Sequence, residues 1–261
     1  MVRVATQAAR RAGVVLAARV GEPLRVETKR SPVDLVTEVD RASERLISRT
    51  LLRAFPDHGI QGEEGALRRG TADYRWIIDP LDGTTNFVHG VPLFGVSIGL
   101  LRRERLQAGV IYDPIRRELF VAVRGRGAFL NGRRLRVAST RDLARSLLST
   151  GFSTTFQVHA ARYLRWFRIF ESNSHAVRRI GSTVLSLAYV AAGRLDGFYE
   201  QGLWAWDMAA GMLLVEEAGG RISDFHGRPP RLGEGELVAS NGRIHHAMLE
   251  VLSRSAFRRR T

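Results

Sequence analysis

The sequence predicts an α+β protein built from two halves, residues 1–140 and residues 141–261. In the first half, helical patterns precede a series of apolar runs separated by turn-forming residues, which is typical of helices packed on a largely antiparallel sheet. In the second half, helical and strand-like patterns alternate, which is typical of an α/β arrangement. The composition, with 44% hydrophobic and 25% charged residues in a chain of 261, is that of a globular protein. We find no internal repeat and no low-complexity linker, so we expect the two halves to share one compact unit.

Two helices are predicted at the start of the first half. Residues 1–20 space four arginines through apolar residues, which indicates an amphipathic helix rather than the uninterrupted apolar block of a signal peptide. Residues 41–55 place Leu46, Ile47 and Leu51 on one helical face, and Pro56 ends the pattern. Strands are then predicted at residues 74–78, 94–101, 106–112 and 118–124.

The second half alternates between the two kinds of element. Strands are predicted at residues 146–150, 197–200, 221–224 and 237–240, and helices at 159–171, 182–192 and 207–218. The longest segment without formal charge, residues 83–101, contains a proline and four glycines, so we expect no membrane-spanning helix. The chain has no cysteine, which excludes disulfides, thiolate zinc sites and a cysteine nucleophile and favours a cytoplasmic setting.

The chain is strongly basic. Its 40 lysines and arginines outnumber 26 acidic residues, giving a net charge of +14, and Lys29 is the single lysine. Such a charge makes nucleic acid one candidate partner. However, the arginines are scattered through the sequence, and only Arg258-Arg259-Arg260 forms a run. A solvated surface that also attracts anionic small molecules is therefore the preferred interpretation.

The stretch from Asp79 to Asn86 is the most informative motif. It follows an apolar strand, and Asp79 and Asp82 flank Pro80, so a stiff turn can direct both carboxylates at one point. Gly83-Thr84-Thr85 resembles the opening of a short helix or turn, whose free N–H groups can bind phosphate. A turn that is simply capped by two aspartates is the alternative.

Further acidic residues follow other predicted strand ends or helix starts, namely Glu63, Glu64 and Asp207. Two carboxylates about 4 Å apart repel by roughly 4 kcal/mol at an effective dielectric constant near 20, and a divalent cation would reverse this repulsion. Oxygen ligands without histidine or cysteine favour Mg²⁺ or Mn²⁺ over zinc. For Asp207 alone, the alternative role is that of a helix N-cap. The local patterns by themselves do not show that the segments with Glu63, Asp79 and Asp207 meet in the folded chain.

Four ordered motifs resemble the signature of the inositol monophosphatase family. They are KRSPVDLVTEVD at 29–40, GEE at 62–64, IDPLDGTTNF at 78–87 and WDMAAG at 206–211. Residues 179–200 resemble the bacterial members in particular, and the similarity extends from the first helix to about Gly242. The resemblance implies a layered αβαβα sandwich and a cytoplasmic homodimer. It also implies lithium-sensitive, magnesium-dependent hydrolysis of phosphate monoesters by a metal-activated water.

The resemblance also implies roles for individual residues. Glu63, Asp79 and the Leu81 carbonyl would hold one Mg²⁺. A second Mg²⁺ would be held by Asp79, Asp82 and Asp207. A third, more weakly bound ion would lie near Glu63, and Mn²⁺ is an alternative metal. Thr84 and Asp40 resemble the pair that orients and deprotonates the attacking water, with Glu63 assisting. The implied substrate-binding residues are Asp82, Gly83, Thr84, Gly181, Ser182, Thr183 and Glu200, of which Glu200 would accept a hydrogen bond from a substrate hydroxyl. A helix N-terminus capped by Ser182 is the alternative for residues 181–183.

The substrate expected from the resemblance is a small phosphorylated polyol or sugar, first of all inositol 1-phosphate. Histidinol phosphate, fructose 1,6-bisphosphate and 3'-phosphoadenosine phosphates are the alternatives within the family. A non-enzymatic alternative is regulatory, because some bacterial relatives bind RNA polymerase or antitermination complexes. We expect Lys29 near a mobile loop that closes over the metals. We expect His89 to pack or to support the metal ligands from behind rather than to be a ligand itself. Arg178 and Arg179 could contact substrate, a partner subunit or only solvent, and the sequence does not choose among these alternatives.

Overall fold

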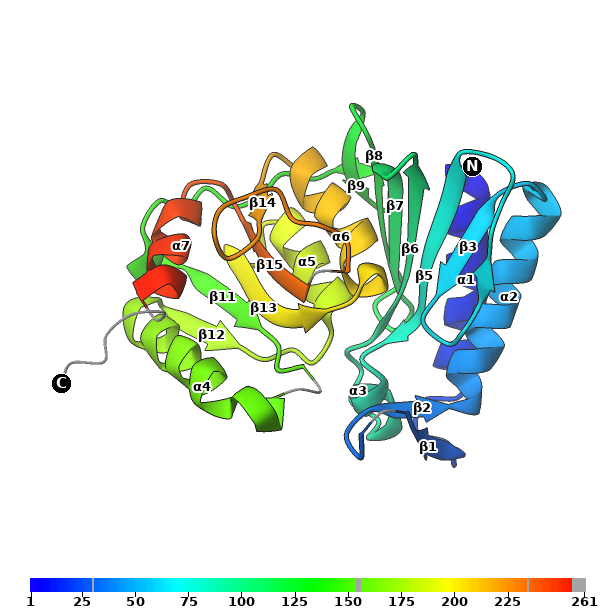
Figure 1. Cartoon of the computed structure of the whole chain (residues 1–261), viewed down its shortest axis with the longest axis horizontal. Coiled ribbons are helices and arrows are strands. Elements are labelled where there is room, and N and C mark those ends of the chain that lie inside the picture. Colours follow the sequence, from blue (N-terminus) through cyan, green and yellow to red (C-terminus); the bar gives the residue numbers. More distant parts are fainter. Residues whose placement is uncertain (30, 154–155, 234, 255–261) are drawn as a thin grey trace.

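The computed structural model describes residues 1–29, 31–153, 156–233 and 235–254, so the arginine run at 258–260 lies outside the described residues. Figure 1 shows helices and sheets stacked in the order α, β, α, β, α. This arrangement confirms the α+β class and the layered αβαβα sandwich. No described helix is long and apolar enough to span a bilayer.

The larger sheet has eight strands in the order β10-β9-β8-β7-β6-β5-β3-β4, and only β3 and β5 pair in parallel. Its outer face is covered by helices α1 and α2 (Figure 1). The bounds are α1 (Val2–Ala17), α2 (Glu38–Ala54), β3 (Gly59–Gly62), β4 (Leu67–Arg68), β5 (Tyr74–Asp82), β6 (Gly95–Arg102), β7 (Arg105–Asp113), β8 (Glu118–Val123), β9 (Gly127–Leu130) and β10 (Arg133–Arg134).

The smaller sheet has five strands in the order β12-β11-β13-β15-β14, and helices α4 and α7 cover its outer face. Helices α5 and α6 fill the space between the two sheets. The bounds are β11 (Leu147–Thr150), α4 (Phe156–Asn173), β12 (Ala176–Arg178), α5 (Thr183–Ala191), β13 (Gly197–Leu203), α6 (Ala205–Glu217), β14 (Arg221–Ser223), β15 (Gly235–Ser240) and α7 (His245–Arg254). Short elements complete the fold: β1 (Val26–Thr28), β2 (Leu35–Thr37), α3 (Thr84–Val88) and a 3₁₀ turn at Leu143–Arg145.

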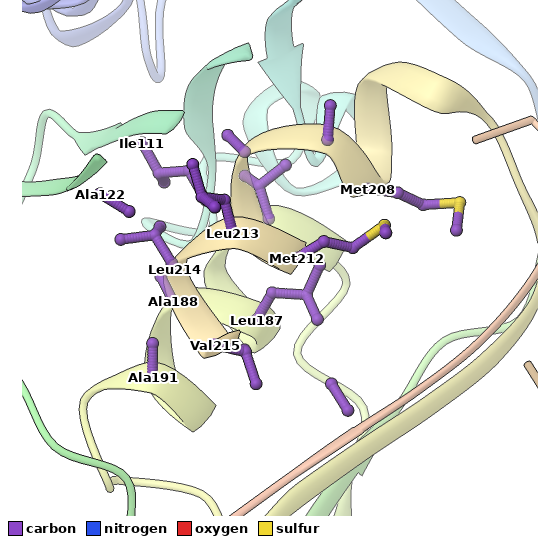
Figure 2. Packing of buried hydrophobic residues seen from close by; sticks show 14 of the residues in the cluster. Ile111, Ala122, Leu187, Ala188, Ala191, Met208, Met212, Leu213, Leu214 and Val215 are labelled. Atoms are coloured by element: carbon purple, nitrogen blue, oxygen red, sulfur yellow. The ribbon is translucent and has the colours of Figure 1, made fainter. Parts of the chain in front are cut away.

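The middle helical layer forms the centre of the core. Leu187 of α5 and Leu213 of α6 are fully buried, and Figure 2 shows them with Ile111 of β7 in the same cluster. Close approach of α6 to β7 requires glycine at position 109, because a Cβ atom there would lie 2.7 Å from the Ala210 carbonyl oxygen. Helix α6 is thereby fixed against the sheet that carries Asp79.

The predicted helices and strands are present, with shifted ends. Helix α2 begins at Glu38 rather than 41, because Thr37 caps it and the Asp40 carboxylate accepts a hydrogen bond from the Thr37 N–H at 2.9 Å. The patterns missed helix α7 and the short strands β1, β2, β4, β9, β10 and β12. Strands of two or three residues show little alternation, and β1, β4 and β10 are exposed throughout, so no apolar pattern marks them. The boundary predicted near residue 140 falls between β10 and β11 and stays a prediction.

Candidate active site

Three aspartates meet where the larger sheet faces the middle helical layer. Asp79 and Asp82 end β5, whose pairing register with β6 shifts between these two residues, and such an irregularity redirects side chains. Asp207 lies in the first turn of α6, where it accepts a hydrogen bond from the Trp204 N–H at 2.6 Å. Trp204 rather than Asp207 is therefore the N-cap. One carboxylate oxygen from each aspartate lies within 4.8 Å of the others.

This aspartate cluster, Asp79, Asp82 and Asp207, carries unbalanced negative charge. Burial, followed by repulsion from Glu63 and from the other two aspartates, raises the pKa of Asp79 well above its usual value. Burial likewise raises the pKa of Asp82 to about 6, although hydrogen bonds from Ser182 and Val184 oppose the shift. Burial and the charges of Glu63 and Asp82 raise the pKa of Asp207. No ion pair of the described residues includes a member of the cluster. Buried carboxylate oxygens with no cationic partner fit a hard divalent cation.

Glu63 approaches the cluster from the end of β3. Its N–H donates to the Ile78 carbonyl oxygen at 3.1 Å, which places it beside Asp79. The Lys29 ammonium donates to Glu63 at 2.8 Å and also contacts the Glu64 carboxylate. Burial alone would lower the pKa of Lys29, but these two carboxylates outweigh it and raise that pKa. The structure thus brings Lys29 to the site itself.

Thr84 and Asp40 form a hydrogen-bonded pair. The Thr84 hydroxyl lies 3.1 Å from Asp40 Oδ1 and 3.1 Å from the Leu81 carbonyl oxygen. Asp40 is fully buried, and its second oxygen accepts the Thr37 hydroxyl at 2.6 Å. Burial raises the pKa of Asp40, although the hydrogen bonds from Thr37 oppose the shift. The capping interaction of α2 therefore also orients the partner of Thr84.

Gly83 and residues 181–183 face each other across the site. Gly83 caps α3 with a positive φ of 90°, and a Cβ atom there would lie 2.9 Å from the Leu93 carbonyl oxygen. The Asn86 amide joins this turn to the second half by donating to the Leu93 and Ile180 carbonyl oxygens at 2.7 and 2.9 Å. Ser182 caps α5 through the Leu185 N–H at 3.3 Å and also donates to Asp82, so it both caps the helix and contacts the cluster.

Glu200 lies at the far side of the site on β13. Thr183 donates to it at 3.1 Å, and burial raises the pKa of Glu200 to about 8 although that hydrogen bond opposes the shift. A cavity of about 840 Å³ connects Glu200 to the acidic end of the site. Its wall includes most of the expected site residues, namely Glu63, Asp82, Gly83, Thr84, Gly181, Ser182, Thr183, Glu200 and Asp207. Arg179 and His89 also line it.

For two residues at the site, nothing in the sequence indicated the contacts that they make in the fold. Asn86 belongs to a recognised motif, but its bridge to Ile180 joins residues 94 positions apart, which no local pattern reveals. Glu44 is one of several charged residues on α2, and only the folded chain shows its contact with the turn that follows β3.

The fold and the site together define a class of protein. The fold is a five-layered αβαβα sandwich that gathers carboxylates able to hold a metal ion near the end of β5, beside a glycine turn. Residues 1–256 match the sequence model of the inositol monophosphatase family. The chain belongs to the inositol monophosphatase family.

Relatives cover nearly the whole chain. The "Nus factor SuhB" of Pseudomonas aeruginosa is 49% identical over 259 residues, covering 97% of this chain and 95% of that protein. The "inositol-1-monophosphatase" of Mesorhizobium japonicum is 44% identical over 256 residues, covering 97% and 96%. A crystal structure of the extragenic suppressor protein suhB from Bartonella henselae matches with a TM-score of 0.93 and 42% identity, covering 97% of this chain and 98% of that one.

Proposed function

We propose that the protein is a magnesium-dependent phosphate monoester hydrolase whose preferred substrate is inositol 1-phosphate. One observation carries this proposal: the buried Asp79 and the partly buried Asp82 and Asp207 bring carboxylate oxygens within 4.8 Å of one another, without a basic partner among the described residues. Such a cluster is unfavourable on its own and becomes favourable with a divalent cation. The relative named inositol-1-monophosphatase supports the choice of substrate.

The residues that would hold magnesium are Glu63, Asp79, Asp82, Asp207 and the Leu81 carbonyl, for two to three ions per subunit. When bound, Mg²⁺ would neutralise the carboxylates and the phosphate and lower the pKa of a bound water. Thr84 donates its hydroxyl proton toward Asp40, which leaves the hydroxyl oxygen free to accept a hydrogen bond from the attacking water. The buried Asp40 carboxylate can in turn accept the proton that the water releases through Thr84.

The alcohol part of the substrate would extend into the cavity toward Glu200. The N–H groups of Gly83 and Thr84 would face the phosphate at the start of α3. Thr183 and Glu200 are adjacent, with 3.1 Å between their oxygens, and together offer hydrogen-bonding groups to a polyol. Histidinol phosphate, fructose 1,6-bisphosphate and 3'-phosphoadenosine phosphates are the competing substrates. We also propose a homodimer, which light scattering on the purified protein would test.

Phosphate release from these four substrates tests the proposed activity. We expect turnover only with Mg²⁺ or Mn²⁺, inhibition by lithium, and the highest kcat/KM with inositol 1-phosphate. Undiminished turnover in excess chelator contradicts the metal-dependent mechanism. A kcat/KM more than tenfold higher for histidinol phosphate than for inositol 1-phosphate reverses the order of substrates.

A regulatory role is a second candidate, favoured by the relative named Nus factor SuhB and by the net charge of +14. In this role the protein would associate with RNA polymerase or an antitermination complex. Asp82→Asn separates the two functions, because it should abolish hydrolysis and leave such an association intact. Replacing exposed arginines by glutamate should have the opposite effect.

A further inference from the structure

Glu44 is a buried carboxylate to which the proposed reaction gives no role. It lies on α2 and is only 5% exposed. Its two oxygens each accept one backbone N–H: Oε2 from Glu64 at 2.8 Å and Oε1 from Ala66 at 2.9 Å. Among the ion pairs of the described residues, none includes Glu44. Both oxygens are thus used to hold the backbone of one short segment.

That segment, residues 62–66, is a tight turn built around the Glu44 carboxylate. The Gly62 N–H closes the turn by donating to the Ala66 carbonyl oxygen at 2.6 Å. Any side chain at position 62 would collide with Glu44, because a Cβ atom there would overlap its carboxylate. Glu63, at the corner of this turn, is fixed to β5 through the Ile78 carbonyl oxygen at 3.1 Å.

We propose that Glu44 is a positioning residue that holds the 62–66 turn so that the Glu63 carboxylate faces Asp79 and can share a magnesium ion with it. This inference rests on the proposed function. A carboxylate suits the task because two N–H donors require two acceptor oxygens, and a glutamine would offer only one oxygen and one competing donor. Residues that orient metal ligands in this way commonly alter metal affinity about 10-fold to 100-fold when they are changed.

Glu44→Gln tests the inference, with Glu38→Gln as the matched control. Glu38 lies on the same helix and also accepts a backbone N–H, from Arg25 at 2.9 Å, but that segment carries no proposed metal ligand. Calorimetric titration with Mg²⁺ in the absence of substrate should show affinity about tenfold weaker for Glu44→Gln and unchanged for Glu38→Gln. The Mg²⁺ concentration for half-maximal turnover should rise by the same factor, while kcat at saturating Mg²⁺ changes much less. A purely structural role would not weaken Mg²⁺ binding while leaving kcat at saturating Mg²⁺ much less changed.

Glu44→Asp is the second variant should the glutamine variant fail to fold. It keeps two acceptor oxygens on a shorter stem, so we expect a weaker loss of Mg²⁺ affinity together with faster hydrogen exchange at the Glu64 and Ala66 amides. Wild-type affinity in the folded Glu44 variants overturns the positioning role and leaves the proposed function standing. A wild-type protein that neither binds Mg²⁺ nor hydrolyses any of the four substrates overturns both.

Discussion

His245 and the aspartate cluster are ionisable groups that lose solvent on folding, and their surroundings contrast. The fully buried His245 has neutral partners for both ring nitrogens, the hydroxyls of Ser223 and Ser240 at 2.8 and 2.9 Å. Burial, and next the charge of Arg221, lowers the pKa of His245 to about 4. In the aspartate cluster the same loss of solvent raises pKa values, because there the charged form is anionic. The histidine satisfies its polar atoms within the chain, whereas the aspartates keep a mutual repulsion that the proposed Mg²⁺ would relieve.

The histidine makes stability depend on pH. Below about pH 6.5, an unfolded chain protonates His245, whereas the folded chain resists protonation until about pH 4. The contribution of His245 to the free energy of unfolding should therefore be complete above pH 6.5 and fall by about 3 kcal/mol as the pH drops to 4, at about 1.4 kcal/mol per pKa unit. The raised pKa values of Asp82 and Glu200 act in the opposite direction, so the contribution of His245 is read from the difference between wild type and variant. Urea unfolding at several pH values measures this slope. His245→Asn should remove the loss of stability that His245 causes toward pH 4, and His246→Asn, at an exposed neighbouring position, should not. Equal slopes in both variants would contradict the assignment.

At the scale of elements, α6 both packs in the core and places Asp207 in the aspartate cluster. Its Leu213 side chain is fully buried between the sheets (Figure 2), and its first turn presents Asp207 to β5. Helix α4, in contrast, covers only the outer face of the smaller sheet, and its Leu164 is 51% exposed. The position of the aspartate cluster is therefore tied to the best-packed helical layer of the molecule.

Leu213→Ala should lower the free energy of unfolding by about 2–5 kcal/mol, because it removes buried methyl groups and leaves a cavity that α6 cannot close. Leu164→Ala, which removes the same atoms from an exposed position, should change it by less than about 0.5 kcal/mol. Chemical denaturation of both variants compares the two sites. Similar losses of unfolding free energy in the two variants would show that the middle helical layer is not the centre of the core.

At the scale of the whole molecule, the site joins parts of the chain that belong to different layers. Asp79 and Asp82 come from the larger sheet, Asp207 from the middle helices and Glu200 from the smaller sheet. An unfolded chain separates these residues, so an ion that binds them together binds only the folded protein.

Magnesium should consequently stabilise the fold. At a concentration 100 times its Kd, one bound ion adds about 2.7 kcal/mol to the free energy of unfolding. Thermal unfolding should show a Tm that rises with Mg²⁺, and NaCl at matched ionic strength should not reproduce the rise. Asp82→Asn should reduce the effect of Mg²⁺. If Mg²⁺ leaves the Tm of the wild-type protein unchanged, the aspartate cluster is not a magnesium site of useful affinity.

Most of the longer helices and strands could be predicted from local patterns, whereas the layered arrangement and the roles of the site residues were implied by the resemblance to the family. Long elements such as α1 and β6 repeat their apolar residues often enough to be recognised, whereas β4 and β10 have two exposed residues each and carry no such signal. The turn at Gly83 likewise has a local signal, because its positive φ suits glycine.

The sequence by itself determined which residues can bind a cation or cap a helix, since these properties depend on side-chain chemistry and on neighbours a few positions away. Only the tertiary structure decided that Asp79 and Asp207 meet, that Asn86 bridges to Ile180, and that Glu44 holds the turn at Glu63. These contacts join residues 20 to 128 positions apart. They arise because two sheets bury their apolar faces against the same helical layer, and that packing is a property of the whole chain.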